Sequence, residues 1–139
     1  MKVAFATQDM KSVDAHFASA RNMAIYDVSA EAHRFIEAVQ FDGVSNQDGQ
    51  HAAEGEDRIS AKVDALNGCA LLFVLAIGGP AAARVVAGRI HPIKISAPEP
   101  IPAVIERIQT MLKGTPPPWM RKILADEKSS MAFLDEEES

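Results

Sequence analysis

Polar and ionisable side chains concentrate in residues 8–21, directly after the first β-compatible segment of the chain. They are Asp9, Lys11, Ser12, Asp14, His16, Ser19 and Arg21. A second segment, Gly78-Gly79-Pro80, follows the most apolar run and precedes a helical pattern, so it offers unpaired backbone N–H groups at a helix N-terminus. Ligands of open α/β sheets bind beyond the carboxyl ends of the parallel strands, where we expect both segments to meet. This chemistry predicts a site for a negatively charged ligand, with His16 as the best metal donor.

Catalytic groups are sparse in the same region. Asp9 and Asp14 could bind a metal in a hydrolase, but no third acidic residue is predicted at this end of the sheet. Gly78-Gly79-Pro80 lacks the lysine and hydroxyl of a phosphate-binding loop, the chain has no G-x-G-x-x-G pattern, and no serine stands on a strand-to-helix elbow. The residues therefore favour binding over catalysis. A metal-dependent phosphoester hydrolase, with Asp9 and Asp14 as ligands, stays open as an alternative.

The single cysteine and the remaining histidines are expected to be structural or solvated. Cys69 starts the predicted central strand, at the sheet end opposite His16, and free cysteines are usually buried. His91 precedes a strand at that same end, His33 lies on a hairpin turn, and His51 lies in a polar loop. One cysteine in 139 residues excludes an intramolecular disulfide, and it excludes a zinc or iron–sulfur site held by several thiolates of this chain alone.

Composition predicts one soluble, cytoplasmic domain. The 47% of hydrophobic residues can form a core without a metal or disulfide. The longest apolar run, Ala70–Ile77, is far shorter than the roughly 20 residues of a membrane span, and the N-terminus is typical of a first strand rather than a signal peptide. A net charge of −5 with one tryptophan and one tyrosine argues against a nucleic-acid-binding surface.

Periodicity and turn residues predict the elements that position these groups. Strands are expected at 2–7, 22–29, 34–41, 69–76 and 93–96, and helices at 56–68, 81–87 and 101–113. The second and third strands form a predicted antiparallel hairpin, with Phe35, Val39 and Phe41 on one face, and residues 42–55 form a predicted mobile surface loop. The fold class is therefore α/β: one three-layer domain with a mixed sheet of about five strands and helices on both faces.

The chain is expected to divide after Gly114. Residues 1–114 form the predicted binding domain, while residues 115–139 comprise a proline spacer, a short amphipathic segment from Trp119 and an acidic tail. Because the spacer should separate this segment from the core, deletion after Gly114 is expected to leave the fold intact. A further alternative function is a cofactor-free regulatory interaction module in which Trp119, Ile123 and the acidic tail dock a partner.

Several segments together resemble the nitrogenase iron–molybdenum cofactor biosynthesis family. They are V-D-A-H-F-A-S-A at 13–20, A-I-Y-D-V at 24–28, G-E-D-R-I at 55–59, A-I-G-G-P-A-A-A-R-V-V at 76–86, I-H-P-I-K at 90–94 and G-T-P-P-P-W at 114–119. The resemblance extends from Lys2 to about Leu124, and its specificity lies in the order and spacing of these motifs. It implies a ribonuclease-H-like fold and a carrier, not a catalyst. The cargo would be an iron–sulfur precursor of the iron–molybdenum cofactor or the cofactor itself. Implied partners are the cluster donor, the scaffold and apo-nitrogenase.

The resemblance also implies the site residues. The cluster-binding histidine of the family lies in an H-F-G motif, which corresponds to His16 here, with Ala18 in place of the glycine. A sulfide-bridged cluster is anionic and largely capped by its own sulfur, so one imidazole on iron can suffice. Lys11, Arg21 and the N–H groups of Gly78 and Gly79 would then balance charge and donate to sulfides.

Overall fold

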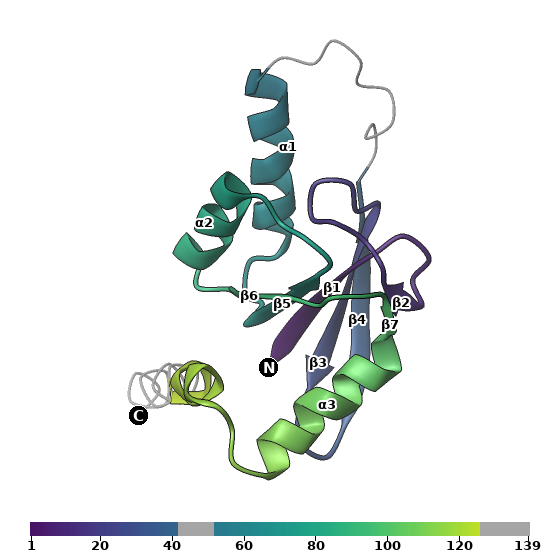
Figure 1. Ribbon diagram of the computed structural model, residues 1–139, viewed down its shortest axis with the longest axis vertical. Helices are drawn as coiled ribbons and strands as arrows, with labels where there is room; N and C mark the ends of the chain where they lie inside the picture. The colour runs from purple at the N-terminus through teal and green to yellow at the C-terminus, as the bar shows by residue number, and fades with distance from the viewer. Residues whose placement is uncertain (42–51, 126–139) are drawn as a thin grey trace, which may run out of the picture.

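The computed structural model describes residues 1–41 and 52–125, with side chains of the second range described from Ile59 onward. Figure 1 shows one α/β unit in which the chain forms a hairpin early and alternates strands with helices later. The elements in order are β1 (Lys2–Thr7), β2 (Ser12–Val13), β3 (Asn22–Val28), β4 (His33–Gln40), α1 (Ala52–Ala65), β5 (Leu71–Val74), α2 (Gly79–Ala87), β6 (His91–Lys94), β7 (Glu99–Pro100) and α3 (Ile101–Lys113).

The main sheet has five strands in the order β4-β3-β1-β5-β6. The β1–β3 and β3–β4 pairs are antiparallel, which confirms the predicted hairpin, whereas β1–β5 and β5–β6 are parallel. The short strands β2 and β7 pair separately, so the loop after β1 is linked to the segment that enters α3. The sheet is thus mixed, as expected.

Alternating side chains of the central strands form two hydrophobic cores, one on each face of the sheet. Phe5, Leu71 and Phe73 pack with the buried face of α3, while Ala4, Leu72 and Val74 pack with Leu66 after α1 and with Ala81 and Val85 of α2. Figure 1 shows α1 and α2 on one side of the sheet and α3 on the other. Burial on both faces explains why β5 is continuously apolar, and the predicted three-layer arrangement is confirmed.

A β-bulge in β4 corrects one prediction for the hairpin. Ile25 pairs with Glu37 and Tyr26 pairs with Phe35, so Ile36 is the additional residue. The bulge reverses the alternation, and Phe35 is 49% exposed with its ring edge-on to Tyr26. Ile36, Val39 and Phe41 instead pack on the opposite face, against the core beneath α1 and α2. Placing Phe35 on the face of Val39 and Phe41 is therefore wrong.

Two further expectations change with the structure. Helix α1 begins at Ala52, so the predicted loop is wrong for 52–55, and its remaining part together with His51 lies outside the described residues. Residues 118–125 are helical, and Met120 is fully buried in the α3-side core, with Trp119, Ile123 and Leu124 packed against that core. The proline spacer does not separate this segment from the core, because its apolar side chains cover the sheet. A domain boundary after Gly114 stays a prediction.

No helix in the described parts of the chain is long and apolar enough to cross a membrane.

Candidate functional site

The backbone at His16 continues the parallel pairing of β1 with β5 beyond the ends of both strands. Ala15 O accepts a hydrogen bond from Leu75 N at 3.0 Å, and Phe17 N donates to Ala76 O at 2.8 Å. His16 is therefore in register with Ala76, two residues before Gly78. Its side chain is exposed, although Ala15 and Phe17 on either side are buried. The two predicted segments do meet at the carboxyl end of β5.

The loop is shaped by a buried lysine that the sequence motifs did not indicate. Lys62 of α1 is 3% exposed, and its ammonium donates to the carbonyl oxygens of Phe17, Ala18 and Ala20 at 2.9, 2.7 and 3.1 Å. The same ammonium lies 5.9 Å and 5.2 Å from the ring centroids of Phe17 and Phe41. A buried charge requires such partners, since desolvation is costly. Lys62 thus joins α1 to the peptide groups that follow His16.

Gln8 holds the two ends of the loop together. Its backbone N donates to Asp14 Oδ1 at 2.8 Å, its amide nitrogen donates to Ser19 O at 2.9 Å, and its amide oxygen accepts from Arg21 N at 2.8 Å. The chain from β1 to β3 is therefore closed at its base by one side chain.

The two aspartates of the hydrolase alternative act as acceptors within this loop. Asp9 Oδ1 accepts from the N–H groups of Lys11 at 2.8 Å and Ser12 at 2.9 Å, and from the Thr7 hydroxyl at 3.3 Å. These bonds, the one from Lys11 first, lower the pKa of Asp9. Because Asp14 likewise accepts from Gln8, both carboxylates have an evident structural use.

The other predicted ligand-binding residues lie in the loop after β1 and at the start of α2. Lys11, Arg21, Gly78 and Gly79 are all exposed. Lys11 O accepts from Ile101 N at the start of α3, and Arg21 O accepts from Phe41 N beside β4. Within the described residues, no hydrogen bond or ion pair joins the side chains of Lys11, His16 and Arg21. Backbone hydrogen bonds thus link the loop after β1 to the β5 extension, to the start of α3 and to the end of β4, while the side chains stay available to a ligand.

Ala18, Gly78 and Gly79 have backbone conformations that carry no steric constraint. Among described residues other than glycine, only Met10 and Arg89 have positive φ, so Ala18 fits where the family motif has glycine. Gly78 has an extended conformation at the N-cap of α2, and a Cβ added to Gly78 or Gly79 meets no atom within 4 Å. The N–H groups of Gly79 and Ala81 lie in the first turn of α2, where a helix leaves donors without helical partners, and Pro80 has no N–H.

Cys69, His91 and His33 lie away from this loop. Cys69 is 4% exposed, and burial raises the pKa of its thiol to about 11, as befits a core residue. His91 stacks on Trp119 with ring centroids 4.7 Å apart, and burial lowers the pKa of its imidazole. His33 is exposed at the start of β4. Within residues 1–41 and 52–125, no three His, Cys, Asp or Glu side chains are grouped to bind a metal.

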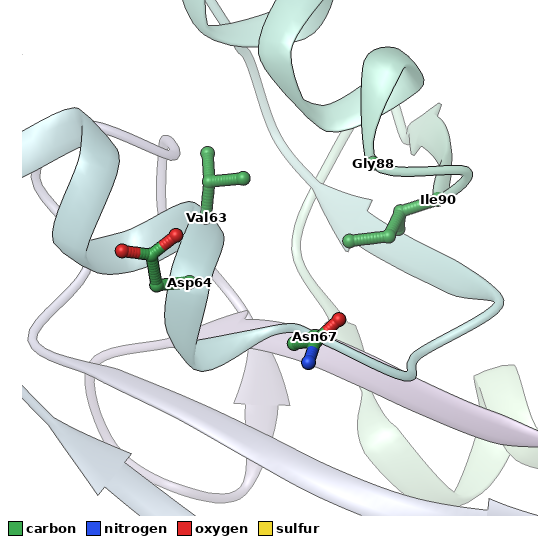
Figure 2. Close-up of a pocket in the computed structure, with 5 residues that line it drawn as sticks. All are labelled: Val63, Asp64, Asn67, Gly88 and Ile90. Carbon is green, nitrogen blue, oxygen red and sulfur yellow. The ribbon is translucent and has the colours of Figure 1, made fainter.

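Two pockets lie at the other end of the sheet. The first, of about 300 Å³, opens between the C-terminal ends of α1 and α2 and is lined by Val63, Asp64, Asn67, Gly88 and Ile90 (Figure 2). The second lies beside the amino end of β6 and is lined by Val86, Arg89, Ile90, His91, Trp119, Lys122 and Ile123. Neither includes a predicted site residue, so both pockets lie apart from the candidate site.

Comparison with known proteins supports the resemblance. Over 125 residues the chain is 58% identical to Protein NifX of Sinorhizobium fredii, covering 90% of this chain and 78% of the relative. It is 50% identical to Protein NifX of Rhodobacter capsulatus, covering 99% and 87%. Protein NifY of Azotobacter vinelandii is 31% identical, with 91% of this chain matching 49% of that protein.

A solved structure supports the fold. The crystal structure of the protein PH0822 aligns with a TM-score of 0.56 and 20% identity, covering 79% of this chain and 89% of that one. This likeness supports a related α/β fold, and the ribonuclease-H-like assignment stays a prediction.

Residues 1–111 match the family described as "Dinitrogenase iron-molybdenum cofactor". With the NifX and NifY relatives, this match supports a role in the biosynthesis of the nitrogenase iron–molybdenum cofactor. Since the matched residues make up most of the chain, it belongs to the dinitrogenase iron–molybdenum cofactor family.

Proposed function

We propose that this chain is a carrier that binds an iron–sulfur precursor of the iron–molybdenum cofactor, or the finished cofactor, as its cargo. It receives the cargo from a cluster donor or scaffold protein and passes it on during nitrogenase maturation, with apo-nitrogenase as a possible recipient. The chain itself catalyses no covalent step in this proposal.

The observation that carries the proposal is the exposed imidazole of His16 on a backbone fixed by hydrogen bonds. Phe17 N–H and Ala15 O attach the loop to the β5 extension, so the ring is presented from a rigid edge rather than a loose loop. Neutral imidazole is a suitable ligand for iron. The first turn of α2, which begins three residues beyond the partner of His16, adds N–H donors and the positive end of a helix dipole for an anionic cluster.

Lys11 and Arg21 supply the charge in this proposal. Both side chains are exposed at the same sheet end, so each can approach a sulfide or carboxylate of the cargo without a change of fold. One metal ligand with a few charge-assisted contacts binds loosely enough for the cargo to be transferred.

The test is cargo retention by the full chain, purified without oxygen from nitrogen-fixing cells. The wild-type protein should be brown, and its visible absorbance should rise in proportion to its iron content. His16→Ala should lose about tenfold or more in cofactor affinity, equivalent to about 1.4 kcal/mol. His33→Ala is the matched control, since His33 is also exposed but lies at the opposite end of the sheet, and it should retain the colour.

Two results would contradict the proposal at different levels. Undiminished iron and absorbance in His16→Ala would show that His16 is not the ligand. A colourless wild-type protein that also fails to take up isolated iron–molybdenum cofactor would exclude the carrier function, and the docking module without cargo would then be preferred.

A further inference from the structure

Lys62 orients three backbone carbonyl groups of the loop that contains His16. The ammonium of Lys62 donates to the carbonyls of Phe17, Ala18 and Ala20 and is almost completely buried. Those carbonyls are therefore turned toward α1. Ala18 and Ser19, which follow His16 closely, are exposed on the surface of the loop.

The orientation of the carbonyls fixes the orientation of the N–H groups. In a planar trans peptide the N–H points opposite to the C=O of the same unit, and the described residues contain no cis peptide bond. The unit that carries Phe17 O also carries Ala18 N–H, and the unit that carries Ala18 O also carries Ser19 N–H. Both N–H groups must then point away from Lys62.

Neither donor has a hydrogen-bond partner among the described residues, unlike two other N–H groups of the same loop. Phe17 N–H is bonded to Ala76 O and Arg21 N–H to Gln8 Oε1. For Ala18 N–H and Ser19 N–H, the described part of the chain provides no acceptor. Successive backbone N–H groups without a partner are donors of the kind that bind anions.

We propose that Lys62 is the positioning residue of an anion-binding loop in which the N–H groups of Ala18 and Ser19 donate to the ligand beside His16. The ligand class is an anion with several acceptor atoms, such as the sulfides or carboxylates of a metal cluster. The proposal rests on the function proposed above for the identity of the cargo. The orientation of the two N–H groups by Lys62 is independent of that function.

Hydrogen exchange of the full wild-type chain at single-amide resolution is the first test. Without ligand, Phe17 and Arg21 should exchange slowly, while Ala18 and Ser19 between them exchange near the rate of an unstructured chain. With saturating iron–molybdenum cofactor, Ala18 and Ser19 should slow by about tenfold or more. Protection of these two amides before ligand is added would overturn the proposal, and so would unchanged exchange in a chain that demonstrably holds the cofactor.

Substitution of Lys62 is the second test. Lys62→Met removes the ammonium but keeps much of the apolar stem, so the carbonyls should turn toward water. Phe17 and Arg21 amides should then lose protection, and affinity for iron–molybdenum cofactor should fall about tenfold. Lys62→Arg keeps the charge and donors and should restore most of the affinity. Lys94→Met is the matched control, because Lys94 is exposed on β6.

The outcomes separate this proposal from the carrier function. If Lys62→Met fails to fold, the exchange pattern of the wild type and the cofactor affinity of Lys62→Arg still test whether Lys62 positions the loop. If the wild-type chain binds no cofactor, the carrier function fails, while the exchange pattern without ligand still tests the role of Lys62. Wild-type affinity in a folded Lys62→Met variant would refute the role of Lys62 alone.

Discussion

The polar residues in and around the loop between β1 and β3 divide into those that hold the loop backbone in place and those that remain exposed. Gln8, Asp9, Asp14 and Lys62 all use their polar atoms on loop peptide groups. His16 keeps its imidazole at the surface. The loop therefore combines a rigid backbone with an exposed imidazole, which is the arrangement that a preorganised binding site requires.

Gly79→Ala tests whether a ligand approaches the start of α2. An added Cβ meets no protein atom within 4 Å, and alanine reduces the entropy of the unfolded chain, so the free energy of unfolding should rise by about 0.4–1 kcal/mol. If the cluster contacts this turn, the same methyl group should weaken cofactor binding severalfold. Chemical denaturation and cofactor titration measure the two effects. Unchanged affinity in a stabilised variant would place the cargo away from α2.

Asp9→Ala tests the role of the carboxylate as a loop acceptor. Hydrogen bonds from Lys11 and Ser12 lower the pKa of Asp9 in the folded chain, so its contribution is present above the ordinary pKa of aspartate and is lost as pH falls through the folded value. Asp9→Ala should therefore be less stable than the wild type at neutral pH, and the two melting temperatures should converge at strongly acidic pH. A constant difference across this range would contradict the assignment.

Sequence reasoning located His16 but not Lys62, and the reason is physical. His16 is part of a local cluster of polar residues after a strand, and a strand end predicts where a ligand binds. Lys62 lies three residues after Ile59 and four before Leu66, on the apolar stripe of α1, where a lysine is normally read as a solvated helix residue. The structural role of Lys62 depends on hydrogen bonds to carbonyls more than 40 positions earlier in the chain, and no pattern within α1 indicates those partners.

At the level of elements, the helical segment at 118–125 completes one face of the sheet. Met120 is fully buried with the apolar side chains of α3, and Trp119 covers His91 at the start of β6. The three prolines before it suggested a spacer, because proline-rich stretches are stiff and lack backbone donors. They do not determine what the following helix contacts. That depends on the uncovered apolar surface beside α3, which only the assembled sheet defines.

Met120→Ala should destabilise the chain by about 2–5 kcal/mol, the usual range for a fully buried methionine. Deletion after Gly114 should be at least as harmful, contrary to the expectation from the proline spacer. Denaturant titration measures both. Arg121→Ala is the control, since the side chain of Arg121 is exposed and its removal should change stability by less than about 0.5 kcal/mol. Wild-type stability of Met120→Ala would mean that the segment does not pack on the core.

The stack of His91 on Trp119 makes the docking of this segment sensitive to pH. Burial lowers the pKa of His91 in the folded chain, so that as pH falls the unfolded chain takes up a proton on this imidazole before the folded chain does. Stability should therefore fall as pH drops through the ordinary histidine range, until the folded form is protonated as well. Trp119 is the single tryptophan, so its fluorescence reports this contact directly. Emission that titrates at or above the ordinary histidine pKa would contradict burial of the ring.

At the level of the whole molecule, the site exists only when distant parts of the chain are assembled. His16 is fixed by Ala76, Lys11 by Ile101 and the loop carbonyls by Lys62, so the supports come from three separate regions. The fold class, the β3–β4 hairpin and the two-sided core followed from alternation and apolar runs. The β2–β7 pair and the bulge at Ile36 did not, because two-residue strands and single extra residues leave no periodic signal.

Because these supports belong to the folded state alone, cargo binding should stabilise the whole molecule. A ligand that binds only the folded chain adds about 2.7 kcal/mol when its free concentration is a hundred times Kd. Iron–molybdenum cofactor should therefore raise the melting temperature of the wild-type chain by several degrees, and of His33→Ala equally. His16→Ala and Lys62→Met should show a much smaller rise at the same concentration. Since both variants alter one sheet end while the melt reports the entire core, equal shifts in all four proteins would mean that the cargo binds elsewhere.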